Sequence, residues 1–230
     1  MISLMDLQRR YADTKDTISE AALKSGHSPD DVRIVAVTKT WPREIVHLAL
    51  RAGISDIGEN RVQEALSKLP PVSEEIRYHL VGHLQRNKVR KAVRLFDVIH
   101  SVDSLSIGRA IGTVAVENNR TIDALIQVNI GEDDAKYGIR TEEVFHIVEE
   151  LQTENGIRII GLMTIGPLFD DPQESRPIFR QLRELRDRVS RDFPLVRELS
   201  MGMTADYDVA VEEGATIVRI GTALFGPRYK

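Results

Sequence analysis

Residues 33–53 read RIVAVTKTWPREIVHLALRAG, and this stretch contains one complete βα unit. Its first part, 33–38, is a short apolar run rich in β-branched residues, which is typical of a strand buried on both faces. Pro42 then stands at a favourable first-turn position, and the apolar residues after it share one face of a helix that Gly53 ends. The stretch therefore predicts a strand, a turn that carries Lys39, and a helix.

The same alternation of apolar runs and helical stripes continues along the chain. The predicted strands are 33–38, 55–58, 77–82, 97–101, 123–129, 157–163, 196–200 and 216–220. The predicted helices between them include 61–69, 85–95, 105–117 and 205–213, one capped by Thr141 and one that carries Ile178 and Val189. A further amphipathic helix, 4–23, precedes the first strand. Repeated βα units require a parallel sheet covered by helices, and eight such units favour closure of that sheet.

We therefore predict an α/β fold, a single (β/α)8 TIM-type barrel with an extra N-terminal helix. The alternative is an open, doubly wound sheet, but its dinucleotide-binding motif G-x-G-x-x-G is absent from the first βα turn. No internal repeat, low-complexity tract or long linker divides the chain, so residues 1–230 are expected to form one domain.

Composition excludes several classes of function. The formal net charge of -4 disfavours nucleic acid and anionic membranes as main partners. The chain has no cysteine, which excludes disulfides, zinc–thiolate sites, iron–sulfur clusters and thiol catalysis, and no metal site is expected. Its start carries acidic residues without the apolar core of a signal peptide, and no apolar run is long enough to cross a bilayer. We expect a cytoplasmic protein.

Functional residues of such barrels follow the carboxyl ends of the strands. Lys39 directly follows the first predicted strand, and a desolvated lysine there can lose its proton and attack a carbonyl. The alternative is an exposed lysine that contacts nothing. The residues in comparable positions are Glu59, Asn60, His83, Gln85, Asn87, Ser101, Asp103, Asn129, Lys136, Met163, Thr164, Ser200, Arg219, Gly221 and Thr222.

An anion site is predicted after the last strand, within the stretch VRIGTALFG. The backbone N–H groups of Gly221 and Thr222, the Thr222 hydroxyl and the start of a short helix can bind a phosphate, and Ser200 can add a hydroxyl. The alternative is a glycine required by a tight turn, with Thr222 as a helix N-cap.

Arg219 alternates with outward-facing neighbours and is expected to point into the barrel mouth, where a ligand can be its partner. A structural ion pair with Asp206 or Glu59 is the alternative. Asn60 either faces the site or only caps the next helix, with Gln63 completing a capping box.

Two further features favour structural roles. His79, inside the third strand, is interpreted as a hydrogen-bonded core residue, whereas His83 lies at the mouth. The basic run after it is interpreted as a solvated helix face rather than a nucleic-acid patch. Its residues are Arg86, Lys88, Arg90, Lys91 and Arg94.

These residues, in this order, resemble the pyridoxal phosphate homeostasis family, known as YggS proteins in bacteria, proline synthase co-transcribed homologues in eukaryotes, and PipY in cyanobacteria. The matching stretches are VAVTKTWP, GENRVQE, HLVGHLQRNK, SVDS, QVNI, KYG, GLMTI, LSMGMTADY and VRIGTALFG. The resemblance runs from about residue 32 to residue 228. Several independent motifs in the same order make it specific. One departure is Thr204, where many members carry serine.

The resemblance implies a monomeric barrel, similar to the N-terminal domain of alanine racemase, that holds pyridoxal 5′-phosphate (PLP) as a Schiff base on Lys39. Ser200, Gly221 and Thr222 would hold the phosphate, and Arg219 would approach the pyridine nitrogen. Asn60 and Met203 would lie near the cofactor. The implied function is PLP (vitamin B6) homeostasis and amino-acid balance without demonstrated catalysis, with PLP-dependent apo-enzymes as candidate recipients and no catalytic residue.

An arginine at the pyridine nitrogen leaves the ring unprotonated and weakens PLP as an electron sink, which agrees with a carrier. The main alternative is a PLP-dependent amino-acid racemase that uses Lys39 as one base. Racemases of this kind take a second base from a β domain, and because the sequence stops at Lys230 we expect no such domain here. A second alternative is a barrel enzyme that uses Lys39 without PLP.

Overall fold

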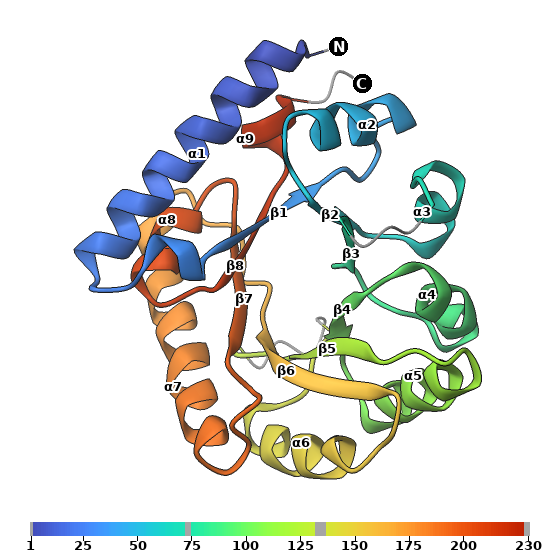
Figure 1. The fold of residues 1–230 in the computed structure, drawn as a ribbon. Coiled ribbons are helices and arrows are strands. Elements are labelled where there is room, and N and C mark those ends of the chain that lie inside the picture. Colours follow the sequence, from blue (N-terminus) through green and yellow to red (C-terminus); the bar gives the residue numbers. More distant parts are fainter. Residues whose placement is uncertain (1, 72–74, 132–136, 228–230) are drawn as a thin grey trace.

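The structure is a computed structural model that describes residues 2–71, 75–131 and 137–227. Eight parallel strands form a closed barrel in chain order, and β8 closes the barrel against β1 (Figure 1). The strands are β1 (Arg33–Val37), β2 (Asp56–Glu59), β3 (Arg77–Leu80), β4 (Val98–Val102), β5 (Ile122–Gln127), β6 (Ile157–Met163), β7 (Glu198–Met203) and β8 (Ile217–Ile220). The predicted barrel is confirmed, and the open sheet is wrong.

Helices surround the barrel and connect successive strands. They are α1 (Leu4–Lys24), α2 (Arg43–Arg51), α3 (Val62–Lys68), α4 (Val89–Leu95), α5 (Leu105–Glu117), α6 (Val144–Gln152), α7 (Arg176–Asp192), α8 (Tyr207–Glu212) and α9 (Thr222–Phe225). Helix α1 is the predicted extra N-terminal helix. Its N-cap is Ser3, whose Oγ accepts a hydrogen bond from the Asp6 N–H at 3.1 Å, and it packs along α8 and α9 (Figure 1).

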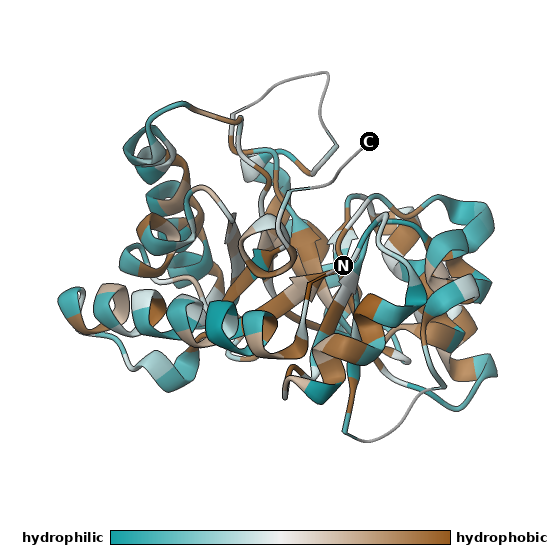
Figure 2. Ribbon diagram, turned by 90° about the horizontal axis from the view of Figure 1, so that it is seen from above, coloured by the Kyte–Doolittle hydropathy of each residue, from teal (hydrophilic) through white to brown (hydrophobic). Residues whose placement is uncertain are grey.

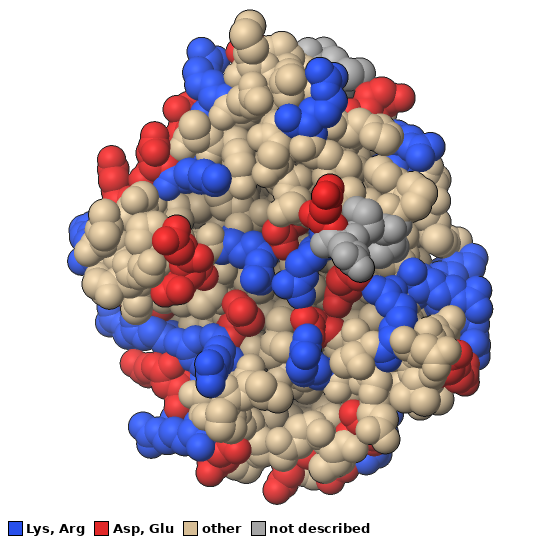
Figure 3. All heavy atoms as spheres, viewed as in Figure 1, with Lys and Arg blue, Asp and Glu red and all other residues tan. Residues whose placement is uncertain are grey.

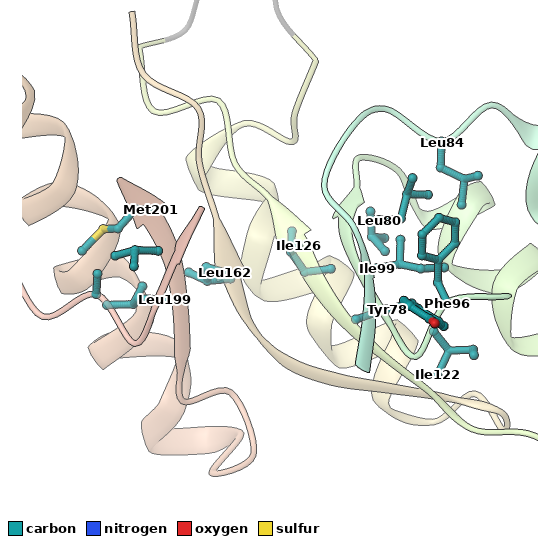
Figure 4. Packing of buried hydrophobic residues seen from close by; sticks show 14 of the residues in the cluster. Tyr78, Leu80, Leu84, Phe96, Ile99, Ile122, Ile126, Leu162, Leu199 and Met201 are labelled. Carbon is teal, nitrogen blue, oxygen red and sulfur yellow. The ribbon is translucent and has the colours of Figure 1, made fainter. Parts of the chain in front are cut away.

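Two apolar layers lie on the two faces of the strands. The layer inside the barrel consists of Val35, Val37, Val81, Val98, Leu125, Met163 and Ile217. The larger layer packs strands against helices; near β3 and β4 it includes Tyr78, Leu80, Phe96 and Ile99 (Figure 4). Apolar colouring accordingly concentrates on the strands and on the inner faces of the helices (Figure 2). Each such side chain contributes about 1.5–3 kcal/mol when fully buried.

Strand β7 differs from its prediction in a way that affects the site. The predicted range was 196–200, but the strand continues to Met203. Its register against β8 shifts between Ser200 and Met203, and Gly202 has a φ of 84°, which only glycine adopts readily. Because the strand bends there and continues, Ser200 lies inside the barrel and Thr204 follows the strand instead.

The predicted Thr141 cap and the alternative in which Asn60 caps a helix are both wrong. Helix α3 begins at Val62 with Arg61 as its N-cap, and no side chain caps it, so Asn60 stands one residue too early for the capping box. Thr141 opens a 3₁₀ turn that precedes α6, and it does not cap that helix.

Candidate functional site

A cavity of about 460 Å³ opens at the carboxyl ends of the strands. It is lined by Val37, Lys39, Asn60, Val81, Ile165, Pro167, Leu168, Met203, Thr204, Ala205, Asp206, Arg219, Gly221 and Thr222. All predicted binding residues except Ser200 belong to this lining. Residues that follow β1, β2, β6, β7 and β8 therefore meet around one space.

Lys39 lies in a tight turn between β1 and α2. The turn is closed by a hydrogen bond from the Trp41 N–H to the Thr38 carbonyl at 3.0 Å. Thr40 has a φ of 65°, a left-handed conformation that is strained for a β-branched residue. Lys39 is half-buried and lines the same cavity as Gly221, so the alternative of an exposed lysine that contacts nothing is wrong.

The buried Lys68 holds this turn from behind. Its Nζ donates to the carbonyl of Thr38 at 2.6 Å and to that of Trp41 at 3.0 Å. Glu64 accepts a hydrogen bond from the Thr40 N–H and lies 2.8 Å from Lys68 Nζ. Sequence reasoning missed Lys68, although it follows Val62 and Ala65 at three-residue intervals on the buried face of α3.

Glu59 completes this buried cluster. One carboxylate oxygen, Oε1, accepts from the Thr38 hydroxyl and lies 2.7 Å from Lys68 Nζ. The other, Oε2, is buried and has no hydrogen-bond partner among the described residues. Burial raises the pKa of Glu59, while Lys68 opposes that shift. Lys68 is therefore the cation that stabilises a costly buried carboxylate beside the Lys39 turn.

Arg219 is buried at the base of the cavity and is held by neutral acceptors. Its Nη1 donates to Ser200 O at 2.8 Å and to Ser200 Oγ at 2.6 Å, and its Nη2 donates to Thr164 O at 2.9 Å. No ion pair with Asp206 or Glu59 forms in the described part of the chain, so that alternative is wrong. Burial lowers the pKa of Arg219 to about 10, which leaves it charged at neutral pH. These bonds use three of its five N–H groups, and the other two have no hydrogen-bond partner among the described residues.

The turn after β8 does not match the alternative of a glycine required by a tight turn with Thr222 as the helix N-cap. Gly221 itself is the N-cap of α9, with a φ of −116°, so neither a left-handed turn nor a Thr222 cap explains it. A Cβ added at Gly221 would meet only Val37, at 3.5 Å or more, so internal packing does not require glycine. Thr204 Oγ1 accepts from the Ala223 N–H at 3.3 Å, which leaves the Thr204 hydroxyl proton free to donate.

Ser200 does not take the predicted place beside this turn. Its side chain is fully buried, and its Oγ is bonded to Arg219 and lies 2.8 Å from His100 Nδ1. The physical reason is the continuation of β7 beyond it, which turns Ser200 into the barrel. Thr204 lines the cavity where Ser200 was expected.

A continuous line of polar side chains runs through the barrel below the cavity. His79 Nε2 lies 2.9 Å from Asp56 Oδ1, and His79 Nδ1 lies 2.9 Å from His100 Nε2. His100 continues to Ser200, and Ser200 to Arg219. The interpretation of His79 as a hydrogen-bonded core residue is confirmed. These five residues are called the interior chain below.

The two buried histidines of the interior chain make stability depend on pH. Burial lowers the pKa of His79 and, more strongly, that of His100, while an unfolded histidine titrates near 6.5. Below about pH 6.5 the unfolded chain therefore binds more protons than the native one. We expect the free energy of unfolding to fall as the pH is lowered from about 6.5 through the folded pKa values, as measured by urea unfolding.

The control for this pH dependence is His47→Gln, because His47 is exposed on α2. His100→Gln should flatten the dependence and His47→Gln should preserve it. Equal slopes in the two variants would contradict the assignment.

Two other predicted mouth residues, His83 and Gln85, line a neighbouring cavity instead of this one. His83 Nδ1 lies 2.9 Å from Asp103 Oδ2, and the His83 ring stacks on Tyr137 with centroids 3.8 Å apart. Lys136, also named from the sequence, lies outside the described residues. Within the described residues, no three His, Asp or Glu side chains gather as a metal would require, and no helix has the length and apolar character to span a membrane.

The basic run lies on the 3₁₀ turn Arg86–Lys88 and on α4, and Lys and Arg gather over that region in Figure 3. Arg90 pairs with Glu117 of α5 at 2.7 Å, and Arg86 donates to the Ser106 carbonyl. These links to the neighbouring helix agree with a solvated helix face.

Comparison with known proteins finds the same architecture elsewhere. The family described as "Alanine racemase, N-terminal domain" matches residues 20–229. The "Pyridoxal phosphate homeostasis protein" of Aquifex aeolicus is 38% identical over 226 residues, covering 97% of this chain and 99% of the relative. Its namesake from Synechocystis is 40% identical and covers 87% and 93%. The structure of PipY from Synechococcus elongatus with PLP bound is 36% identical, with a TM-score of 0.82 and coverage of 96% of this chain and 100% of that one.

Proposed function

Because the chain belongs to the family of pyridoxal phosphate homeostasis proteins, we propose that it binds PLP at the barrel mouth, with Lys39 as the amine that condenses with the aldehyde. The observation that carries this proposal is that Lys39, Arg219 and the Gly221–Thr222 turn line one cavity. PLP carries an aldehyde, an aromatic nitrogen and a phosphate. The cavity offers an amine, a guanidinium, and hydroxyl and N–H donors, which fit these three groups in kind.

The phosphate is assigned to the β8 end of the cavity. The N–H of Thr222 lies in the first turn of α9 and has no partner within that helix. Gly221 leaves the backbone open to close approach, and the Thr204 and Thr222 hydroxyls can donate. Thr204 replaces Ser200 in this assignment. Asn60 and Met203 line the same cavity and are assigned to contact with the ring.

Arg219 supports storage of the cofactor over catalysis. When bound, PLP supplies an electron sink for carbanion chemistry, which is strongest with a protonated ring nitrogen. Arg219 is charged and can only donate, so it suits an unprotonated ring nitrogen. We infer a non-catalytic role: binding PLP and handing it on, with apo-enzymes that need PLP as recipients. The cytoplasmic location and the monomeric state stay predictions.

The racemase alternative requires a base on each side of the substrate. Among the described lining residues, the only other group besides Lys39 that can act as a base is Asp206. That carboxylate already accepts hydrogen bonds from the Met203 N–H at 2.8 Å and from the Ser175 hydroxyl at 3.0 Å. This supports the carrier over the racemase.

Purified protein tests the proposal directly. Addition of PLP should produce the visible absorption band of a Schiff base. Reduction with borohydride should then leave a pyridoxyl group that mass spectrometry locates on Lys39. Absence of a band would contradict PLP binding and favour a barrel enzyme that uses Lys39 alone. Incubation of the PLP-loaded protein with L-alanine tests the racemase, because formation of D-alanine would contradict the carrier.

Replacing Thr204 by valine should weaken PLP binding by about tenfold, because a hydrogen bond to a charged group is lost while the side-chain shape is kept. Fluorescence or absorption titration with PLP measures the change. The control is Thr113→Val, since the Thr113 hydroxyl bonds to the Arg109 carbonyl on the surface of α5. An unchanged affinity in Thr204→Val would remove this residue from the phosphate site.

A further inference from the structure

The interior chain links the cavity to the opposite end of the barrel. Asp56 is the first residue of β2, where the strands begin, and its side chain is 14% exposed. Arg219 lines the cavity at the end where the strands stop. Between them lie His79 from β3, His100 from β4 and Ser200 from β7, all fully buried. Successive polar atoms are 2.9, 2.9, 2.8 and 2.6 Å apart, so the chain has no gap.

The two ends of this chain determine the positions of its protons. At one end an arginine can only donate, so Ser200 Oγ accepts from Arg219. At the other end an ionised carboxylate can only accept, so His79 Nε2 carries a proton toward Asp56. Arg33, 3.6 Å from Asp56, favours the ionised carboxylate.

In the middle of the interior chain, only one arrangement of protons then satisfies every hydrogen bond. A neutral His79 with its proton on Nε2 must accept at Nδ1, which requires a proton on His100 Nε2. A neutral His100 must in turn accept at Nδ1, which requires the Ser200 hydroxyl as donor. Burial lowers the pKa of His79, and the charges of Arg77 and Arg33 lower it further, so an additional proton is disfavoured although Asp56 opposes the shift. If the hydrogen bonds donated in the opposite direction, the Ser200 hydroxyl proton would have no acceptor within the interior chain.

We propose that this one-way chain of hydrogen bonds orients Arg219, and that Asp56 at its far end is a positioning residue for the cofactor. Every donor in the chain points from Arg219 toward Asp56. Ser200 therefore offers a lone pair to the guanidinium and holds its plane, and the remaining N–H groups of Arg219 stay directed to the ligand. The effect on PLP binding rests on the proposed function, whereas the arrangement of protons is a property of the ligand-free protein.

Nitrogen-15 NMR of the ligand-free protein tests the arrangement. Both His79 and His100 should carry their proton on Nε2 and leave Nδ1 unprotonated, with signals unchanged between about pH 8 and 7. An Nδ1–H form or a doubly protonated ring in either residue at neutral pH would overturn the inference, whether or not PLP binds.

Three variants test the effect on the site. Asp56→Leu should weaken PLP binding between about twofold and thirtyfold and shift the visible absorption of bound PLP. Asp56→Asn keeps an oxygen that accepts from His79 and should restore both properties. The matched control is Asp123→Leu, because Asp123 also lies near the start of its strand and loses ion pairs with Arg77 and Arg158.

The outcomes separate the two proposals. An effect in Asp123→Leu equal to that in Asp56→Leu, or no effect in Asp56→Leu, would overturn the positioning role. Absence of PLP binding in the unaltered protein would overturn the proposed function and leave the NMR result standing. If Asp56→Leu does not fold, the NMR signals of the unaltered protein and the affinity of Asp56→Asn decide.

Discussion

Lys39→Ala is expected to abolish the absorption change on addition of PLP and to weaken PLP binding by at least about a hundredfold, or about 2.7 kcal/mol. The reason is that Lys39 is the only lysine among the described residues that line the cavity, so its removal takes away the sole amine there that can bond the aldehyde. The side chain is half-buried at the mouth, and its truncation should leave the barrel folded. Absorption titration and mass spectrometry after borohydride reduction measure both effects.

The matched control for Lys39 is Lys88→Ala. Lys88 lines a neighbouring cavity of about 380 Å³, which shares Asn60 with the main one. This variant should bind PLP as the unaltered protein does. A pyridoxyl group recovered on Lys88, or a normal absorption band in Lys39→Ala, would show that the wrong amine was assigned.

Lys68→Met is expected to lower the free energy of unfolding by about 3–5 kcal/mol, because it leaves the buried carboxylate of Glu59 without its cation. The same change removes the donor that holds the carbonyls of Thr38 and Trp41, so the strained turn of Lys39 should loosen and PLP affinity should fall as well. Urea unfolding measures the first effect, and PLP titration measures the second.

The control for Lys68 is Lys24→Met, which removes an exposed ion pair with Glu212 and should cost at most about 1 kcal/mol. The pH dependence gives a second check. Protonation of Glu59 relieves the uncompensated charge, so the deficit of Lys68→Met relative to the unaltered protein should shrink as the pH falls toward the raised pKa of Glu59. A deficit that is small at neutral pH would mean that Glu59 is already neutral beside Lys68.

Predictions from sequence succeeded where one segment carries the whole signal. The strand 157–163 and the helix 105–117 were predicted with the ends that the structure has, because an apolar run or a helical stripe is a local property. Lys39 and the Gly221–Thr222 turn could be selected because both directly follow such strands.

The errors arose where neighbouring strands decide the geometry. Ser200 was taken as a strand end, but pairing with β8 and the left-handed Gly202 carry β7 on to Met203. Lys68 was passed over because its partners Glu59 and Thr38 come from other elements, and no spacing within α3 reveals them.

The order of apolar runs and helix signals along the chain was enough to predict eight parallel strands, a closed barrel, and a lysine and a glycine–threonine turn that follow two of those strands, because apolar periodicity is a local property of each segment. Only the tertiary structure decided which hydroxyl reaches the cavity, which lysine supports the Lys39 turn, and in which direction the interior chain donates. Those properties depend on strand register and on contacts between distant segments, and hydrogen-bond direction follows from which groups meet inside the closed barrel.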